Sequence, residues 1–197
     1  MTDPLLTEAL ALLDNTMKEA VEAGEPDANA MSLATVSREG WVSSRMVLLK
    51  GLSEDGLVFY TNLESNKAAQ LGENPNAAVV FHWKSITKQL RVEGRTVPVS
   101  AAQADAYFAT RDRGSQIGAW ASEQSRPMEN RQALETRIAV FEKKFDQRPV
   151  ERPPHWSGYC LQPRMLELWE GRTHRLHVRW RYDRTDSGQW SKVLLYP

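Results

Sequence analysis

Cysteine is almost absent from this sequence, because the chain of 197 residues contains only Cys160. A single cysteine cannot form an internal disulfide, and it excludes zinc ribbons, iron–sulfur clusters and CxxC redox chemistry. Long apolar runs are also lacking. The runs at 9–13 and 77–81 have five residues each, far fewer than the ~18 needed to cross a bilayer. The first residues lack the basic start of a secretion signal, so we expect a cytoplasmic protein that does not enter a membrane.

The sequence has no excess charge of either sign. It contains 25 Lys and Arg and 25 Asp and Glu, so the formal net charge is +0 at pH 7. Such a chain has no bulk attraction for nucleic acid or an anionic membrane, and an anionic partner would need a local cluster of cations. With 41% hydrophobic and 25% charged residues, the composition is that of a folded protein, and we expect one domain, 1–197.

The commonest catalytic motifs are missing as well. The sequence has no GxSxG elbow, GxxxxGK[ST] loop, GxGxxG turn or HExxH helix, so a hydrolase triad and a Rossmann oxidoreductase lose their main support. His174 and His177 are three residues apart and would face opposite ways on a strand, without a suitably spaced acidic or sulfur partner. We therefore predict no metal site.

Short strand-like segments dominate the rest of the sequence. Leucines at helical spacing predict an N-terminal helix within 1–25, and further helices are expected at 65–73, 100–110 and 128–145. A proline-containing loop is expected at 146–157. The β-rich segments are 30–36, 41–49, 57–61, 77–83, 88–97, 158–162, 165–169, 175–182 and 189–195. Many short antiparallel strands with a few helices predict an α+β protein built around a small barrel.

Residues 175–181 (RLHVRWR) alternate in polarity, which is typical of a strand with two different faces. One face carries Leu, Val and Trp, and the other carries Arg175, His177, Arg179 and Arg181. A row of cations can guard a solvated sheet edge against aggregation. Guarding more often uses Lys, however, and three Arg with one His suit the recognition of planar or anionic groups.

Arg45 and Lys50 lie at the ends of the segment RMVLLK, five residues apart. In a regular strand this odd spacing places them on opposite faces, where they would hold two different anions. The alternative is that both are strand-end charges that extend to water.

Two helical segments could also bind phosphate groups. Residues 65–67 (SNK) begin a predicted helix, where free backbone N–H groups, the helix dipole and a Lys favour a phosphate, although an ordinary N-cap explains the Ser equally well. Tyr107, Arg111 and Ser115 are spaced four apart. One continuous helical face could therefore bring them to a second phosphate, and a solvated helix end is the alternative.

Taken together, these segments resemble the pyridoxamine 5′-phosphate oxidase family, FMN-dependent enzymes that make pyridoxal 5′-phosphate. The matching stretches are 45–50 (RMVLLK), 59–63 (FYTNL), 115–120 (SQIGAW), Gln124-Ser125, and Arg175-Leu176-His177 with Arg179. They occur in the family's order across 30–197. The resemblance implies an FMN-binding split β-barrel, mostly antiparallel with flanking helices, and a homodimer with two FMN sites between subunits. It implies oxidation of a phosphorylated B6 vitamer by dioxygen.

The resemblance also implies a role for each matching residue. FMN phosphate ligands are Arg45, Lys67 and Ser125, the last from the pair with Gln124. The ribityl chain and isoalloxazine are lined by Met46, Val47, Leu48, Tyr60, Thr61, Gln89, Trp169 and Arg179. The substrate phosphate is clamped by Lys50, Tyr107, Arg111 and Ser115. Arg175 and His177 lie over the substrate ring and are the implied catalytic residues.

Three features depart from the family pattern. Asn66 stands at a position beside the FMN phosphate where the family usually has Arg, and Val178 replaces a common acidic residue. The longer basic N-terminal arm that covers the substrate in some members is lacking. Two other functions stay open: a related split-barrel flavin oxidase acting on another ring, and a non-catalytic flavin- or pyridoxal-phosphate-binding protein. The four residues of the phosphate clamp argue against the first, because an unphosphorylated substrate needs no such clamp.

Overall fold

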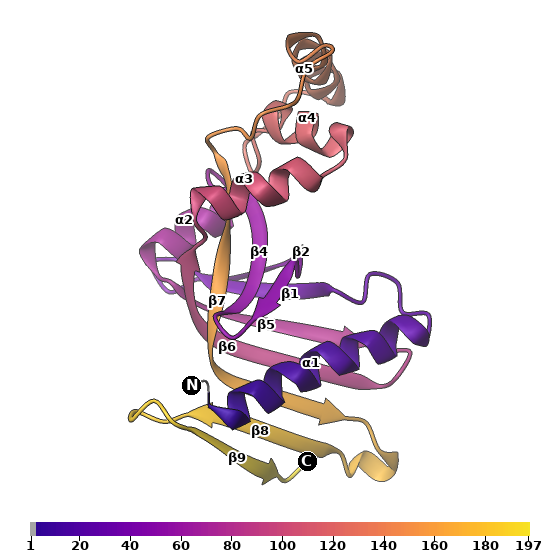
Figure 1. Cartoon of the computed structure of the whole chain (residues 1–197), viewed down its shortest axis with the longest axis vertical. Helices are drawn as coiled ribbons and strands as arrows, with labels where there is room; N and C mark the ends of the chain where they lie inside the picture. The colour runs from indigo at the N-terminus through magenta and orange to yellow at the C-terminus, as the bar shows by residue number, and fades with distance from the viewer. Residues whose placement is uncertain (1–2) are drawn as a thin grey trace.

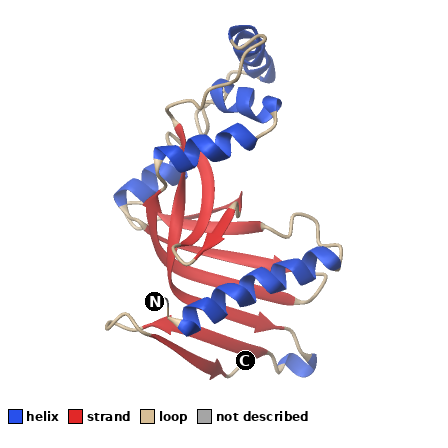
Figure 2. Ribbon diagram, viewed as in Figure 1, coloured by secondary structure: helices blue, strands red, loops and turns tan. Residues whose placement is uncertain are grey.

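One curled antiparallel sheet organises the protein, which we describe from a computed structural model for residues 3–197 (Figures 1 and 2). Met1 and Thr2, part of the expected helical segment 1–25, lie outside the described residues. The strands are β1 Ala30–Val36, β2 Val42–Leu48, β3 Gly51–Ser53, β4 Gly56–Asn62, β5 Asn76–Trp83, β6 Lys88–Pro98, β7 Trp156–Glu170, β8 Val178–Arg184 and β9 Trp190–Leu195. Their order is β2-β1-β5-β6-β7-β4-β3, with β8 pairing with β7 and β9 with β8. The predicted antiparallel split-barrel architecture is confirmed.

The helices lie around this sheet: α1 Pro4–Glu22, α2 Asn66–Glu73, α3 Ala101–Thr110, α4 Arg113–Ala121, α5 Arg131–Lys144 and the 3-10 turn η1 Thr173–Arg175. Helices α3, α4 and α5 gather beyond one end of the sheet, whereas β8 and β9 form the other end (Figure 1). No helix within residues 3–197 has both the length and the apolarity needed to cross a membrane.

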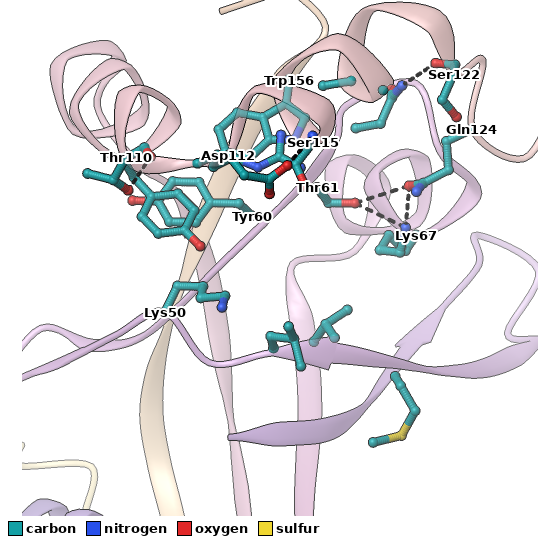
Figure 3. A pocket seen from close by; sticks show the side chains of 18 residues that line it. Lys50, Tyr60, Thr61, Lys67, Thr110, Asp112, Ser115, Ser122, Gln124 and Trp156 are labelled. Carbon is teal, nitrogen blue, oxygen red and sulfur yellow. Dashed lines mark hydrogen bonds between the residues drawn. The ribbon is translucent and has the colours of Figure 1, made fainter. Parts of the chain in front are cut away.

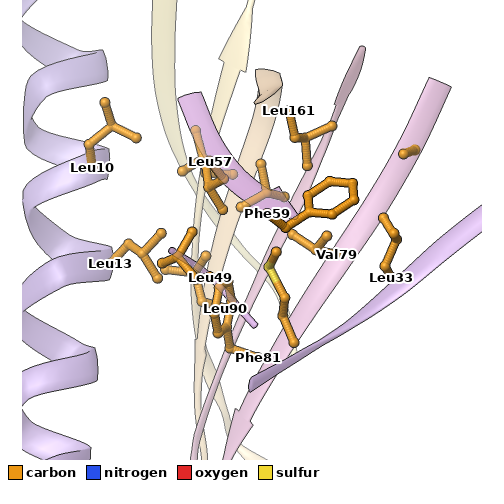
Figure 4. Close-up of a cluster of buried hydrophobic side chains, with 14 of the residues drawn as sticks. Leu10, Leu13, Leu33, Leu49, Leu57, Phe59, Val79, Phe81, Leu90 and Leu161 are labelled. Carbon is orange, nitrogen blue, oxygen red and sulfur yellow. The ribbon is translucent and has the colours of Figure 1, made fainter. Parts of the chain in front are cut away.

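The N-terminal helix forms as predicted. Pro4 occupies its first turn, and the Asp3 carboxylate caps it by accepting a hydrogen bond from Leu5 N–H at 2.9 Å. Leu10 and Leu13 are buried against the sheet (Figure 4). Val21, near the end of the helix, is exposed.

Helix α1 is also tied to the C-terminal hairpin. The Glu8 carboxylate accepts hydrogen bonds from Tyr182 Oη at 2.8 Å and from Lys192 Nζ at 2.6 Å. Asp3 Oδ2 accepts a bond from Trp190 N–H at 2.9 Å. The first helix and the last two strands are therefore joined by side chains that lie far apart in sequence.

Two hydrophobic clusters divide the interior. The main core lies between the sheet strands and α1, with Phe59, Phe81 and Leu161 fully buried (Figure 4). The second, which we call the helical core, lies among α3, α4 and α5 and contains Phe108 and Trp156. Strand β7 begins at Trp156 in the helical core and continues through the main core, so it connects the two.

Strand β7 corrects the sequence prediction of two separate strands at 158–162 and 165–169. The structure has one strand of 15 residues from Trp156 to Glu170. Its register with β6 shifts between Glu93 and Gly94, which indicates a β-bulge at the Pro163-Arg164 step. Pro163 interrupts the sequence pattern but not the strand, because a bulge accommodates its missing N–H group.

The helix predicted at 100–110 agrees with α3, but α4 was not predicted. The interpretation of one continuous helical face through Tyr107, Arg111 and Ser115 is wrong, because α3 ends at Thr110 and a separate helix, α4, begins at Arg113. The Asp112 carboxylate caps α4 by accepting a bond from Ser115 N–H at 2.8 Å. A local Asp N-cap thus outweighs helix continuation.

The strand predicted at 175–182 begins three residues later, at Val178. Residues before it form the connection from β7, in which His174 and Arg175 have positive φ angles of 55° and 62°. The chain must reverse here to pair antiparallel with β7, and this reversal uses the residues that were assigned to the strand. Arg175, His177 and His174 are therefore turn residues, and the prediction that Arg175 and His177 share a strand face with Arg179 is wrong.

Candidate functional site

A cavity of about 710 Å³ lies between the sheet and helices α3 and α4. Figure 3 shows Lys67 on one side of it and Lys50 on the other. The structure places many of the predicted site residues on its walls: Met46, Val47, Leu48, Lys50, Tyr60, Thr61, Lys67, Tyr107, Arg111, Ser115 and Gln124. These residues come from separate segments between positions 46 and 124, so the fold brings together positions that are distant in sequence.

Lys67 is half-buried at one side of the cavity. Its Nζ donates hydrogen bonds to Thr61 Oγ1 at 3.0 Å, Ser65 Oγ at 3.2 Å and Gln124 Oε1 at 2.8 Å. All three acceptors are neutral. Burial, and then the positive charge of Arg45, lower the pKa of Lys67 to about 8. A cation held this way, without an ion-pair partner among residues 3–197, is a ready site for an anion.

Arg45 lies next to Lys67 and strengthens this positive region. It is not on the cavity wall. Its guanidinium donates to Leu33 O at 3.2 Å and to Gln70 Oε1 at 3.4 Å, and also to Thr35 Oγ1. Burial lowers the pKa of Arg45. It too has no carboxylate partner in the described part of the chain.

The N-terminus of α2 completes the same region. Asn66 N–H donates to Ser125 Oγ at 3.4 Å, so the predicted Ser125 lies at the start of this helix. Ser65 is the N-cap residue but does not cap with its side chain. Its hydroxyl donates to Asn62 O at 2.7 Å and accepts from Lys67. The ordinary N-cap interpretation of Ser65 is therefore wrong, and its side chain leaves the N–H groups that follow Asn66 available to an anion.

Arg111 lies in the other part of the cavity. Its Nη1 is buried and has no hydrogen-bond partner among the described residues. The guanidinium carbon is 4.9 Å from the ring centroid of Trp156 and 5.5 Å from that of Phe108. Burial lowers the pKa of Arg111. A buried donor without an acceptor is costly, so this atom points to a ligand with acceptor oxygens.

Trp156 is a cavity residue that sequence reasoning missed. It was placed in the proline-containing loop 146–157, but it is the first residue of β7 and lines the cavity. Its ring is nearly parallel to that of Tyr60, at 5.2 Å between centroids, and Tyr60 stacks on Tyr107 at 4.1 Å. A tryptophan directly before a β-rich segment was the available indication.

The remaining predicted residues form a second group far from the cavity. This group, which we call the β8 group, consists of Gln89, Trp169, Arg175, His177 and Arg179. Gln89 pairs with Trp169, which in turn pairs with Arg179 across the sheet, and the rings of Trp169 and His177 are 4.5 Å apart. None of them lines the cavity. They lie toward η1, at the opposite end of the molecule from α3 and α4 (Figure 1).

Arg179 is held by a carboxylate that the sequence did not reveal. Glu167 is 2% exposed and accepts ion pairs at 2.9 Å from both Arg91 and Arg179. Arg179 Nη1 also donates to Tyr196 O at 3.1 Å. Glu167 lies within the otherwise apolar stretch 165–169, so its burial between two cations depends on strand pairing.

His177 has a fixed ring orientation. Its Nδ1 accepts a hydrogen bond from Arg172 N–H at 3.1 Å. An Nδ1 that accepts this bond is unprotonated, so the neutral ring carries its proton on Nε2. That atom is the one available to a substrate.

Several large apolar side chains are exposed on strand β2 and beside the β8 group. On the edge strand β2, Val42 is 72% exposed and Met46 is 62% exposed. Near the β8 group, Leu176 and Leu194 are exposed as well. Exposed apolar patches of this kind mark contact surfaces.

Comparison with known proteins gives consistent results over the whole chain. Residues 17–145 match the family described as pyridoxamine 5'-phosphate oxidase, and residues 156–197 match the pyridoxine 5'-phosphate oxidase C-terminal dimerisation region. The chain is 52% identical to a pyridoxine/pyridoxamine 5'-phosphate oxidase of Sphingopyxis alaskensis, over 100% of this chain and 91% of the relative. A protein of the same name from Rhodospirillum rubrum is 50% identical, over 95% of each chain.

Solved structures agree with this assignment. PhzG from Burkholderia lata 383, in complex with tetrahydrophenazine-1-carboxylic acid, superposes with a TM-score of 0.91 at 28% identity, covering 100% of this chain and 94% of that one. A pyridoxamine 5'-phosphate oxidase-related, FMN-binding protein from Nostoc punctiforme shares the fold, with a TM-score of 0.74 at 22% identity over 93% and 96% of the chains. The chain belongs to the pyridoxamine 5'-phosphate oxidase family.

Proposed function

We propose that this protein oxidises pyridoxamine 5′-phosphate or pyridoxine 5′-phosphate to pyridoxal 5′-phosphate, with FMN as cofactor and dioxygen as electron acceptor. The observation that carries the proposal is one cavity with two separate positive regions, whose cations form no direct ion pair within residues 3–197. The Asp112 carboxylate also lies on the wall and interacts with Arg111 electrostatically. Lys67 and Arg45 form the first, and Arg111 with Lys50 forms the second. Two phosphate groups, one from FMN and one from the substrate, match this arrangement.

The residues present fit FMN. Lys67, Ser125 and the start of α2 would hold its phosphate, and Arg45 would add positive charge from beside the cavity. Residues 46–48, Tyr60 and Thr61 would line the rest of the molecule. When bound, FMN supplies the group that accepts hydride from C4′ of the substrate and passes the electrons to dioxygen, which gives hydrogen peroxide. The chain's own contribution is to bind and orient the two reactants.

Arg111, Lys50, Tyr107 and Ser115 would hold the substrate phosphate. The Arg111 Nη1 donor gains an acceptor when a phosphate oxygen binds, and Lys50 adds a second positive charge from across the cavity. Arg175 and His177 would orient the pyridine ring, His177 by donating a hydrogen bond from Nε2–H to the substrate.

The cavity and the β8 group lie at opposite ends of one chain. We therefore propose that the β8 group of one subunit completes the cavity of the other. The match of residues 156–197 to a dimerisation region supports this arrangement. The exposed apolar residues of β2 and of the β8 end are suitable for such a contact. The cytoplasmic location expected from the sequence stays a prediction.

The proposed function is tested by adding pyridoxine 5′-phosphate to the FMN-loaded protein without oxygen. We expect bleaching of the flavin absorbance and formation of pyridoxal 5′-phosphate, followed by hydrogen peroxide when air is admitted. A flavin that stays oxidised would indicate a binding protein. Reduction by tetrahydrophenazine-1-carboxylic acid but not by pyridoxine 5′-phosphate would favour an activity on the ligand bound in the PhzG structure.

The shared site predicts complementation between two impaired variants, assayed at a pyridoxine 5′-phosphate concentration far below the KM of Arg111→Met. Arg111→Met damages the cavity and Arg175→Leu damages the β8 group, so a mixed dimer contains one intact site and one doubly damaged site. With random pairing in a two-fold dimer, coexpression should restore about a quarter of wild-type activity. Activity no higher than the sum of the two separate variants would show that both residues serve the same subunit's site.

A substitution at Asn66 should tighten FMN binding. Asn66→Arg places a cation at the start of α2 beside the proposed phosphate position, and one such contact adds ~1 kcal/mol or more. Fluorescence titration of the apoprotein with FMN measures the change. Gly72→Arg adds the same charge near the other end of α2, where Gly72 has open space around it, and should have no such effect. Equal affinity in Asn66→Arg and wild type would contradict the placement of Asn66.

FMN affinity should depend on pH through Lys67. The pKa of Lys67 is lowered to about 8 in the free protein, and a bound phosphate raises it because it favours the charged ammonium. Binding above pH ~8 therefore requires proton uptake, and the affinity should fall by up to about tenfold per pH unit there while changing little from pH ~7 to 8. Lys67→Arg stays charged and should give a flat profile. A flat wild-type profile up to pH ~10 would exclude this role for Lys67.

A further inference from the structure

The structure holds Arg111 in an unusual way. Its buried Nη1 has no hydrogen-bond partner among the described residues. Its guanidinium instead lies over two aromatic rings, with the closer centroid, that of Trp156, at 4.9 Å. An arginine over an aromatic face is attracted by the ring quadrupole, most strongly by tryptophan. The orientation of Arg111 is therefore set by an aromatic surface and not by an acceptor of its own.

Trp156 is also close to the tyrosines on this side of the cavity. Its ring lies 5.2 Å from Tyr60 and 6.2 Å from Tyr107, with interplanar angles of 1° and 8°. Tyr60 and Tyr107 themselves stack at 4.1 Å. One indole thus contacts the guanidinium and lies parallel to both phenol rings.

The indole has a firmly fixed position. Trp156 is 7% exposed, and its backbone pairs with Asn62 where β7 meets β4. Arg152 donates to Trp156 O at 2.7 Å and pairs with Asp105 at 2.6 Å. Asp105 belongs to α3, the helix that carries Tyr107. The start of β7 is therefore fastened to the helix whose residues it orients.

We infer that Trp156 is a positioning residue for the substrate phosphate, holding Arg111 and Tyr107 in the geometry that binds it. The inference rests on the proposed function, in which Arg111 and Tyr107 contact that phosphate. Trp156 acts through these two residues and does not itself take part in the chemistry.

The physical reason is preorganisation. A free arginine side chain samples many rotamers, and ordering it costs conformational entropy when the ligand binds. The Trp156 face restricts the guanidinium before the substrate arrives and keeps water from one side of it. Loss of that face should weaken the binding of any phosphate, and it should leave the hydride transfer step of bound substrate nearly unchanged.

Three variants provide the test. Trp156→Leu keeps an apolar side chain without an aromatic face, and Trp156→Phe keeps a smaller face. The matched control is Trp120→Leu, because Trp120 packs in the same helical core but contacts Phe141 and Phe145 instead of the clamp. Each protein is assayed at saturating FMN with pyridoxine 5′-phosphate, and inorganic phosphate serves as a competitive inhibitor.

We expect Trp156→Leu to raise KM and the inhibition constant of phosphate by about tenfold or more while kcat stays within about threefold. Trp156→Phe should raise both constants by about threefold, because tryptophan is the better cation–π partner. Trp120→Leu should leave both unchanged, even where it lowers the melting temperature. If Trp156→Leu does not fold, Trp156→Phe decides alone.

The outcomes distinguish a failure of the proposed function from a failure of the positioning role of Trp156. Wild-type protein that does not oxidise pyridoxine 5′-phosphate at all refutes the proposed function. Active wild-type protein with unchanged KM and phosphate inhibition in Trp156→Phe and Trp156→Leu refutes the positioning role. A fall in kcat alone also refutes it, because that pattern indicates a role in the chemical step.

Discussion

Replacing Lys67 by Met should remove most of the protein's affinity for FMN. Hydrogen bonds to charged groups contribute ~1.5–3 kcal/mol, so we expect the dissociation constant to rise about 10- to 100-fold. The apoprotein should be no less stable than wild type, because the substitution also removes a half-buried ammonium that lacks an ion-pair partner in the described structure. Fluorescence titration and thermal unfolding measure the two effects separately.

The control for this substitution is Lys88→Met. Lys88 pairs with Glu19 at 2.6 Å, outside the cavity, so its loss should leave FMN binding unchanged. If both variants bind FMN like the wild type, Lys67 does not contact the cofactor phosphate. A loss of affinity in both would indicate a general effect of charge.

Replacing Arg111 by Met should weaken the substrate instead of the cofactor. The guanidinium has a buried donor that gains a partner only when an anion binds, and charge-assisted bonds to phosphate are among the strongest polar contacts. We expect KM for pyridoxine 5′-phosphate to rise by about 30- to 100-fold, corresponding to roughly 2–3 kcal/mol, with FMN affinity near the wild-type value. Steady-state kinetics at saturating FMN measures this effect.

Arg113→Met is the matched control, because Arg113 lies two residues further along the chain but donates to Phe145 O and Arg148 O, away from the cavity. It should leave KM unchanged. The assignment of Arg111 is wrong if Arg111→Met releases FMN and keeps the KM of the reconstituted enzyme. Opposite responses of the Lys67 and Arg111 variants would show that the cavity holds two anions in two places.

The sequence was most informative where local rules act alone. The span 30–36 agrees with β1, Ala30–Val36, because alternating burial and a turn at each end define a strand without tertiary help. The helix predicted at 100–110 also begins where expected, and the Ser100 hydroxyl caps it by accepting from Gln103 N–H at 3.1 Å. The resemblance to the family identified the residues of the cavity wall as one site. Their spacing along the chain alone would not have shown that they lie together.

The errors occur where long-range contacts decide the structure. Residues 175–177 alternate in polarity like a strand, but the antiparallel return from β7 requires a reversal at that point. Trp156 and Glu167 were missed because neither lies in a recognisable motif. Glu167 is buried between Arg91 and Arg179 only because β6, β7 and β8 are neighbours, which periodicity along one segment cannot reveal.

The bonds between α1 and the C-terminal hairpin have a consequence for how the protein folds. The Glu8–Tyr182 bond joins residues 174 positions apart, and the Asp3–Trp190 bond joins residues 187 apart. Closing such long loops costs entropy early, and contacts of this kind slow folding. During synthesis α1 leaves the ribosome long before β8 and β9, so the side of α1 that bonds to this hairpin stays uncovered until these strands emerge.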